Sequence, residues 1–159
     1  MTDLGGLLAA LVDAGVEFIV VGGAAATAHG ASRLTQDIDV VYSREPDNLE
    51  RLAAALAPHA AYLRGAPAGL PFTLDAGTLR NGANFTLVTD LGDIDLLAEI
   101  TGGGGYRDLL SSTVVLRAFG RDVRCLGLRK LIEVKRAAGR PKDFEAIAEL
   151  EIILEDSGD

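Results

Sequence analysis

Two short segments with the same alternating pattern place the strongest constraint on the fold of this chain. Each has an isoleucine between two aspartates, once at residues 37–39 and again at residues 93–95. On a β-strand, side chains two positions apart point to the same side of the sheet. Each segment is therefore predicted to be a strand with two carboxylates on one face and apolar residues on the other.

The four carboxylates belong to Asp37, Asp39, Asp93 and Asp95. If the two strands are neighbours, three or four of these groups crowd one patch of the sheet, where like charges resist ionisation without a compensating cation. A hard divalent ion with oxygen ligands is the usual compensation, and a pair of such ions suits the binding of a triphosphate. The alternative is that the aspartates lie on a solvated face of the sheet.

A glycine pair follows the first apolar run of the chain. Residues 18–21 read as a short buried strand, Gly22-Gly23 interrupts it, and residues 24–28 are small helix formers. Such a turn lets the backbone approach a ligand, and an anion such as phosphate is the ligand expected there. The alternative is that the turn has a structural role only, because strand–glycine–helix turns are common. The spacing excludes a P-loop and a GxGxxG fingerprint. Arg33 and Thr35, just before the first aspartate pair, are further candidates for nucleotide binding.

The other expected elements follow from periodicity and from proline and glycine positions. We expect helices at about residues 3–14, 46–58, 128–138 and 141–154. We expect strands at residues 37–42, 85–89, 94–98, 113–119 and 122–126, the last four as two hairpins. Residues 59–82 are expected to form loops with weak strands.

These elements predict an α/β (α+β) fold in a single domain that spans residues 1–159. Its core would occupy about residues 16–126, with a sheet of about four to six mixed strands, and a C-terminal helical part would follow at about residues 127–155. Helices at the two ends of the chain would flank the sheet.

The net charge argues against a protein that coats nucleic acid without sequence preference, because the chain has 15 Lys and Arg and 23 Asp and Glu, a net charge of −8. Residues 121–143 nevertheless hold eight cations against three acids, a local net of +5. Either a solvated helical face or a local anion site explains this window.

The single cysteine, Cys125, rules out an internal disulfide and fits a reducing cytoplasm. No apolar run reaches the roughly 18 residues of a membrane span, and no secretory leader is recognisable. We therefore expect a cytoplasmic protein with no membrane partner.

Lys135 interrupts an apolar stripe on the predicted helix at residues 128–138. It lies at helical spacing from Leu128, Leu131 and Ile132, so it is expected to face inward. A buried ammonium needs a partner or an anion, unless the side chain extends to the edge of the core.

Taken together, these segments resemble the nucleotidyltransferase superfamily to which DNA polymerase β belongs. The signature of a glycine turn, Asp-x-Asp and a later carboxylate is found here as VGGAAATAHGASRLTQDIDVVY and LGDIDLL. A third segment, LRKLIEVKRAAGRPKDFEAIAEL, is similar to the C-terminal part of small AbiEii-type abortive-infection toxins. The resemblance covers roughly residues 16–150.

The resemblance implies a two-metal Mg²⁺ site. Asp37 and Asp39 would coordinate both ions. Asp95 matches the third carboxylate, which can activate an acceptor hydroxyl, and Asp93 on the same face is a second candidate.

The resemblance also implies a nucleotide site. Gly22 and Gly23 would hold the phosphates, Lys135 would contact the triphosphate, and Asp143 matches the acid that follows this lysine. The chain departs from many relatives at Ala146, where they have a further aspartate, and at Gly23, where minimal relatives have serine.

The implied activity is Mg²⁺-dependent transfer of NMP from an NTP to a hydroxyl acceptor. The AbiEii-like segment implies tRNA or another RNA as acceptor, in a toxin that is paired with an antitoxin. Two alternatives are transfer to a small hydroxyl compound such as an aminoglycoside, and a non-catalytic module that binds nucleotide or an antitoxin.

Overall fold

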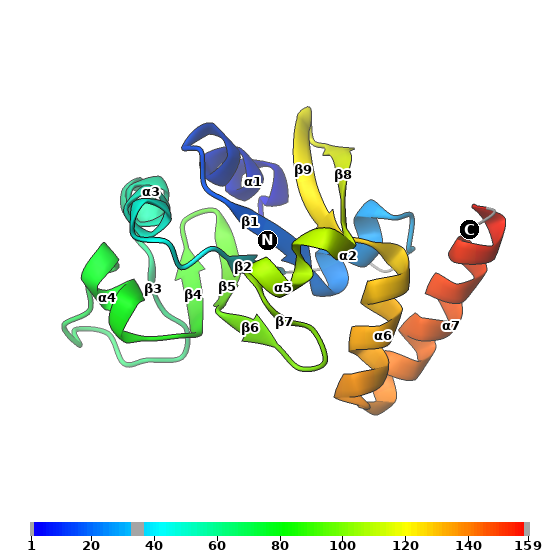
Figure 1. The fold of residues 1–159 in the computed structure, drawn as a ribbon. Helices are drawn as coiled ribbons and strands as arrows, with labels where there is room; N and C mark the ends of the chain where they lie inside the picture. The colour runs from blue at the N-terminus through cyan, green and yellow to red at the C-terminus, as the bar shows by residue number, and fades with distance from the viewer. Residues whose placement is uncertain (1, 33–36, 158–159) are drawn as a thin grey trace.

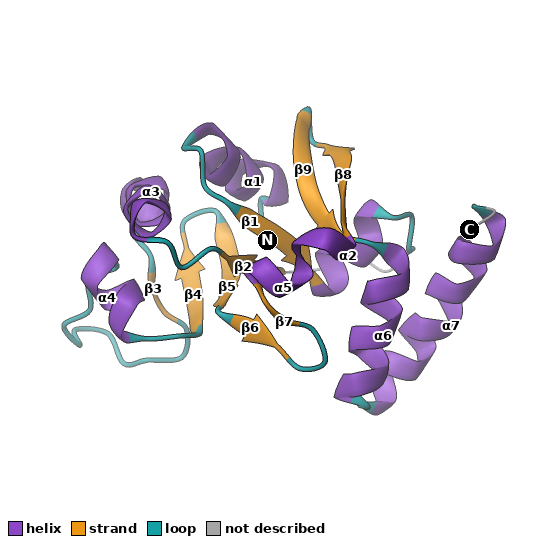
Figure 2. Cartoon of the chain, in the orientation of Figure 1, coloured by secondary structure: helices purple, strands orange, loops and turns teal. Residues whose placement is uncertain are grey.

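The computed structural model describes residues 2–32 and 37–157, which fold into helices packed around a twisted mixed sheet (Figures 1 and 2). Among these residues the main sheet has seven strands in the order β3-β4-β5-β2-β1-β9-β8. They are β1 (Phe18–Val21), β2 (Asp37–Tyr42), β3 (Tyr62–Leu63), β4 (Phe85–Thr89), β5 (Gly92–Leu97), β8 (Thr113–Ala118) and β9 (Arg121–Leu126). A separate ribbon pairs β6 (Glu99–Ile100) with β7 (Gly104–Gly105).

Helices surround this sheet, and two of them, α6 and α7, pack side by side at one end of the molecule (Figure 1). The α-helices are α1 (Leu4–Asp13), α2 (Gly22–Ala28), α3 (Pro46–Leu56), α4 (Ala76–Asn81), α5 (Tyr106–Leu109), α6 (Leu128–Ala138) and α7 (Pro141–Asp156). Short 3₁₀ turns follow α3 at Ala57–His59 and α5 at Leu110–Ser112. The prolines of α3 and α7 lie in the first turn, where a missing N–H costs no helical hydrogen bond.

Strand β2 lies at the centre of the sheet, antiparallel to β1 and parallel to β5. In this register Val21, the last residue of β1, lies opposite Asp39. Asp39 in turn lies opposite Asp95 on β5. The glycine turn after β1 and the two aspartate segments therefore meet at one place in the sheet.

The alternation predicted for the aspartate segments is confirmed. Ile38, Val40, Ile94 and Leu96 are completely buried, whereas the aspartates between them are only half-buried. The four apolar side chains belong to one hydrophobic cluster with residues of α1 and α3, so burial of this face fixes which way the carboxylates point.

Two expectations need correction. The sheet has seven strands in the described part of the chain instead of four to six, because the short strand β3 adds to its β4 edge. The segment at residues 59–82 is also not all loop and weak strand, since it contains α4. Asp75 caps this helix by accepting a hydrogen bond from the Thr78 N–H at 2.8 Å. Leu79, a residue of the same helix, is fully buried.

In the described part of the chain, no helix has both the length and the apolar character that crossing a bilayer requires.

Candidate functional site

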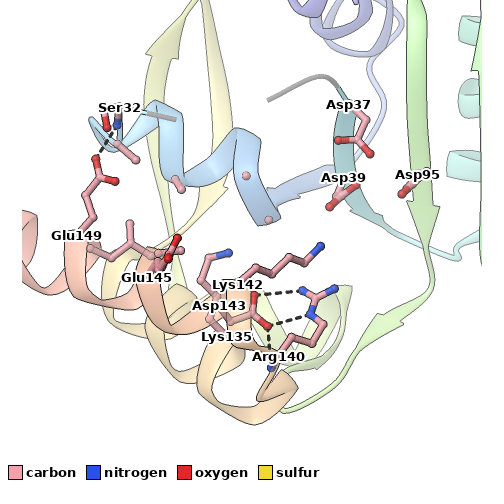
Figure 3. A pocket seen from close by; sticks show the side chains of 16 residues that line it. Ser32, Asp37, Asp39, Asp95, Lys135, Arg140, Lys142, Asp143, Glu145 and Glu149 are labelled. Atoms are coloured by element: carbon pink, nitrogen blue, oxygen red, sulfur yellow. Dashed lines mark hydrogen bonds and ion pairs between the residues drawn. The ribbon is translucent and has the colours of Figure 1, made fainter. Parts of the chain in front are cut away.

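Three carboxylates from two neighbouring strands converge in the middle of the sheet. Asp37 and Asp39 come from β2 and Asp95 comes from β5, and Figure 3 shows the three side chains grouped together. One oxygen from each lies within 4.8 Å of the others. The parallel pairing of β2 with β5 produces this cluster, because it places Asp39 and Asp95 side by side on the same face.

Asp39 is the most perturbed member of the cluster. Burial, followed by the negative charges of Asp95 and Asp37, raises the pKa of Asp39 to about 7. Its Oδ1 atom is buried and has no hydrogen-bond partner among the residues that the structure describes. A divalent cation would satisfy this oxygen and remove the repulsion. The three carboxylates therefore fit a hard, oxygen-preferring ion such as Mg²⁺.

Arg64 holds the fourth aspartate and one member of the cluster. Its Nε atom lies 3.3 Å from Asp93 Oδ2 as an ion pair, and its Nη2 donates to Asp95 Oδ1 at 2.9 Å. Asp93 is on the same sheet face as Asp95 but is not one of the three clustered carboxylates. Sequence reasoning did not identify Arg64, because a lone arginine in a segment rich in glycine and proline gives no signal of this long-range contact.

The glycine turn is packed directly against Asp39. Gly22 has φ +65°, and a Cβ atom added to it would lie only 2.5 Å from Asp39 Oδ2. Any side chain at this position would displace the carboxylate, and the left-handed backbone would be strained as well. Gly22 and Gly23 form the first turn of α2 and line the same cavity as the three clustered aspartates.

The cavity has a volume of about 670 Å³ and lies between the sheet, α2 and the two C-terminal helices. Among the described residues, its far wall carries three cationic side chains opposite the carboxylate cluster (Figure 3). They are Lys135 from α6, with Arg140 and Lys142 from the start of α7. Sequence reasoning had singled out only Lys135, although the Arg-Pro-Lys-Asp sequence at a helix start was a usable signal for the other two.

Lys135 lies half-buried in this wall, as its position on the apolar stripe predicted. The pKa of Lys135 is lowered, mainly by burial and also by the nearby cations Arg140 and Lys142, and the carboxylates of Asp143 and Asp39 oppose this shift only in part. A buried ammonium that faces an acidic cluster across a cavity is well placed for an anion bound between them.

Asp143 is almost completely buried and is engaged with Arg140. Its Oδ2 accepts hydrogen bonds from the Arg140 backbone N–H at 3.1 Å and from Nε at 2.8 Å, and its Oδ1 accepts one from Nη2 at 3.2 Å. The Arg140 guanidinium holds the pKa of Asp143 below its usual range. Asp143 thus caps α7 and fixes the Arg140 side chain, instead of pointing alone into the cavity.

Two predicted site residues, Arg33 and Thr35, lie outside the described residues. Just before them, the Ser32 N–H donates to Glu149 Oε1 on α7 at 2.6 Å. Glu149 and Glu145 also line the cavity. This contact joins the segment that follows α2 to α7.

Part of the cationic window, residues 121–143, is paired with acids outside the cavity. Three of its members pair with acids on other surfaces, Arg121 with Asp13, Lys130 with Glu133 and Arg136 with Glu151. Only Lys135, Arg140 and Lys142 of this window line the cavity. The positive charge that faces the carboxylates is therefore local.

No family model matches this sequence, and no curated protein matches it significantly. Solved structures do match. One is TM1012 from Thermotoga maritima, assigned as a nucleotidyltransferase, with 13% identity, coverage of 89% of this chain and 86% of that chain, and a TM-score of 0.56. The chain has a nucleotidyltransferase fold.

The same nucleotidyltransferase fold occurs in the antibiotic-resistance factor ANT(2″)-Ia. Its crystal structure with adenylyl-2″-tobramycin shares 17% identity, covers 94% of this chain and 86% of that chain, and gives a TM-score of 0.58. Its solution structure shares 18% identity, covers 93% and 85%, and gives a TM-score of 0.53. These neighbours confirm the fold that the sequence resemblance implied, and they carry no evidence of a specific closeness to AbiEii-type toxins.

Proposed function

We propose that the protein is a Mg²⁺-dependent nucleotidyltransferase that moves an NMP group from an NTP to a hydroxyl acceptor. The observation that carries this proposal is the carboxylate cluster of Asp37, Asp39 and Asp95, which faces a cationic wall across one cavity. Phosphoryl chemistry of this kind depends on positioning and on stabilisation of charge, and the cavity offers both.

The three carboxylates have two roles in the proposed reaction, metal binding and proton acceptance. Asp37, Asp39 and Asp95 would hold Mg²⁺, which when bound supplies positive charge to the α-phosphate and to the leaving pyrophosphate. Asp95 accepts the proton of the acceptor hydroxyl. The acceptor oxygen then forms a bond to the α-phosphorus, the bond from that phosphorus to the bridging oxygen breaks, and pyrophosphate leaves.

The opposite wall holds the leaving group. Lys135 and Lys142 contribute ammonium donors, and Arg140, oriented by Asp143, contributes a fixed guanidinium. Gly22 has no side chain, so the phosphates can approach the backbone beside Asp39. We retain Gly23, Arg33 and Thr35 as proposed nucleotide contacts.

For the acceptor, we propose an RNA 3′ end such as that of tRNA, in a toxin that a cognate antitoxin restrains. This proposal rests on the AbiEii-like C-terminal segment. We also propose a cytoplasmic location, which agrees with a single cysteine, Cys125, that is free and buried.

A small hydroxyl compound such as an aminoglycoside is the second candidate. Two observations favour it: ANT(2″)-Ia, of the same fold, was solved with adenylyl-2″-tobramycin, and three cations of the cationic window are paired with acids of this chain.

The test is incubation of the purified protein with Mg²⁺ and each of the four α-³²P-labelled NTPs, with total tRNA in one arm and tobramycin in another. We expect label in one acceptor and its loss in Asp39→Asn, while Asp122→Asn on an exposed strand position keeps it. Metal-dependent NTP binding without transfer to any hydroxyl acceptor would support a non-catalytic module. Absence of both transfer and binding would contradict the proposed function.

Expression in cells distinguishes a toxin that modifies RNA from a resistance enzyme that modifies a small compound. A toxin that modifies RNA arrests growth, and Asp39→Asn abolishes the arrest. A resistance enzyme permits growth and raises tolerance to the compound that it modifies.

A further inference from the structure

The Arg64 side chain reaches across one strand of the sheet to the edge of the carboxylate cluster. Arg64 follows β3, and its Nη2 donates both to the Leu87 carbonyl on β4 at 2.8 Å and to Asp95 Oδ1 on β5 at 2.9 Å. Its Nε lies 3.3 Å from Asp93 Oδ2, and its side chain is only 29% exposed. Arg64 therefore bridges the two aspartates of β5 from a fixed position.

Sheet geometry alone does not decide which of these two aspartates joins β2. The parallel register places Asp93 beside Asp37 in the same way as it places Asp95 beside Asp39. All four side chains lie on one face of the sheet. By strand pairing alone, either Asp93 or Asp95 could therefore join Asp37 and Asp39 to form a group of three carboxylates. Among the described residues, however, the carboxylates that cluster are those of Asp37, Asp39 and Asp95.

We infer that Arg64 selects Asp95 over Asp93 as the third carboxylate of the cluster. It does so by pairing with Asp93 away from the cluster while it anchors one oxygen of Asp95 within reach of Asp39. Arg64 is a positioning residue in this account, because it acts through the two aspartates and does not itself contact the metal. The inference rests on the proposed function insofar as the cluster binds a divalent ion.

The test is titration of the purified, nucleotide-free protein with Mn²⁺, followed by electron paramagnetic resonance. Four proteins are compared first: wild type, Asp93→Asn, Asp95→Asn and Arg64→Met. We expect Asp95→Asn to weaken Mn²⁺ affinity by about ten-fold or more, and Asp93→Asn to weaken it by much less. In Arg64→Met the released Asp93 can enter the cluster, so this selectivity should shrink.

The double variants measure this change of ligand directly. In the Arg64→Met background, we expect Asp93→Asn to cost more affinity, and Asp95→Asn to cost less, than each costs in wild type. Arg64→Lys keeps the charge but cannot span both aspartates, so its selectivity should be intermediate. Arg121→Met, which breaks the bidentate pair of Arg121 with Asp13 on another surface, should leave both the affinity and the selectivity at wild-type values.

Each outcome supports or overturns a defined claim. Equal losses from Asp93→Asn and Asp95→Asn in wild type, or unchanged selectivity in both Arg64→Met and Arg64→Lys, would overturn the role of Arg64. If Arg64→Met does not fold, Arg64→Lys and its double variants decide. A wild-type protein that does not bind Mn²⁺ at all would instead overturn the metal site, and with it the proposed function.

Discussion

Asp39 lies so close to Gly22 that no side chain fits between them: a Cβ atom on residue 22 would be 2.5 Å from Asp39 Oδ2. The two residues meet because β1 ends opposite Asp39, and the chain turns into α2 immediately afterwards. The glycine turn and the central carboxylate therefore form one unit. A substitution at Gly22 should therefore alter the position of the Asp39 carboxylate.

Gly22→Ala should damage the cluster beyond its cost to the fold. The left-handed backbone at φ +65° costs an alanine about 1–2 kcal/mol, and the added methyl group also displaces the Asp39 carboxylate. Thermal unfolding measures the first effect, and Mn²⁺ titration measures the second. Gly69→Ala is the matched control, because Gly69 also has a positive φ of +92° but open space around its Cβ position. If both variants bind Mn²⁺ equally well, the contact between Gly22 and Asp39 has no part in metal binding.

The raised pKa of Asp39 predicts a pH-dependent stability in the absence of metal. Burial and the neighbouring carboxylates raise this pKa from 3.8 to about 7, so the folded state holds the proton more tightly than the unfolded state does. The contribution of Asp39 to stability therefore falls as pH rises from about 4 to 7, by at most about 4 kcal/mol. Urea unfolding of wild type and Asp39→Asn isolates this contribution. The two proteins should differ little at pH 4, and the asparagine variant should be the more stable one at pH 8.

Mg²⁺ should reverse the order of stability at pH 8, so that wild type becomes more stable than Asp39→Asn. Bound metal offsets the repulsion that destabilises ionised Asp39, so Mg²⁺ should stabilise wild type at pH 8 and much less at pH 5, where protons compete for the carboxylate. Asp39→Asn should show little stabilisation at either pH. Equal stabilisation of both proteins by Mg²⁺ would mean that the ion binds elsewhere.

Lys135→Met should weaken NTP binding while it leaves the fold intact. Methionine preserves most of the buried hydrocarbon, and the lost contact is a charge-assisted bond worth about 1.5–3 kcal/mol, which corresponds to roughly a 10- to 100-fold rise in KM for NTP. Lys130→Met is the control on the same helix, because Lys130 pairs with Glu133 and does not line the cavity. Identical KM values in the two variants would remove Lys135 from the nucleotide site.

Asp143→Ala should lower both stability and activity. It removes the carboxylate that accepts a hydrogen bond from the Arg140 backbone N–H at the start of α7, at a cost of about 1–3 kcal/mol, and it releases the Arg140 side chain from its fixed position. Asp75→Ala removes a comparable cap from α4, which does not line the cavity. Denaturant unfolding should show similar losses in the two variants, but pyrophosphate release should fall only in Asp143→Ala. A similar fall in both would assign Asp143 to stability alone.

Local pattern was sufficient to predict the elements that carry the carboxylates. The apolar run at residues 18–21 gave the bounds of β1, whose residues are all buried, and the alternation at residues 37–42 gave those of β2. Helical spacing likewise placed Lys135 on the inner side of α6.

What the sequence did not reveal depends on contacts between distant segments. Arg64 is 29 and 31 residues from the two aspartates that it bridges, and only the order β3-β4-β5 brings it to them. The helix α4 was missed because its one strong signal, the Asp75 cap, lies in a segment that several glycines and prolines interrupt. Similarly, the family resemblance implied an acid near the nucleotide at Asp143, but only the folded structure brings this carboxylate against the Arg140 side chain.

The most direct test of the central claim is a crystal of the protein grown with Mn²⁺ and a non-hydrolysable NTP analogue, measured at the manganese absorption edge. We expect an anomalous peak bounded by the carboxylates of Asp37, Asp39 and Asp95, with the analogue's phosphates between that peak and Lys135. A fully occupied analogue with no manganese at these three carboxylates would contradict the account.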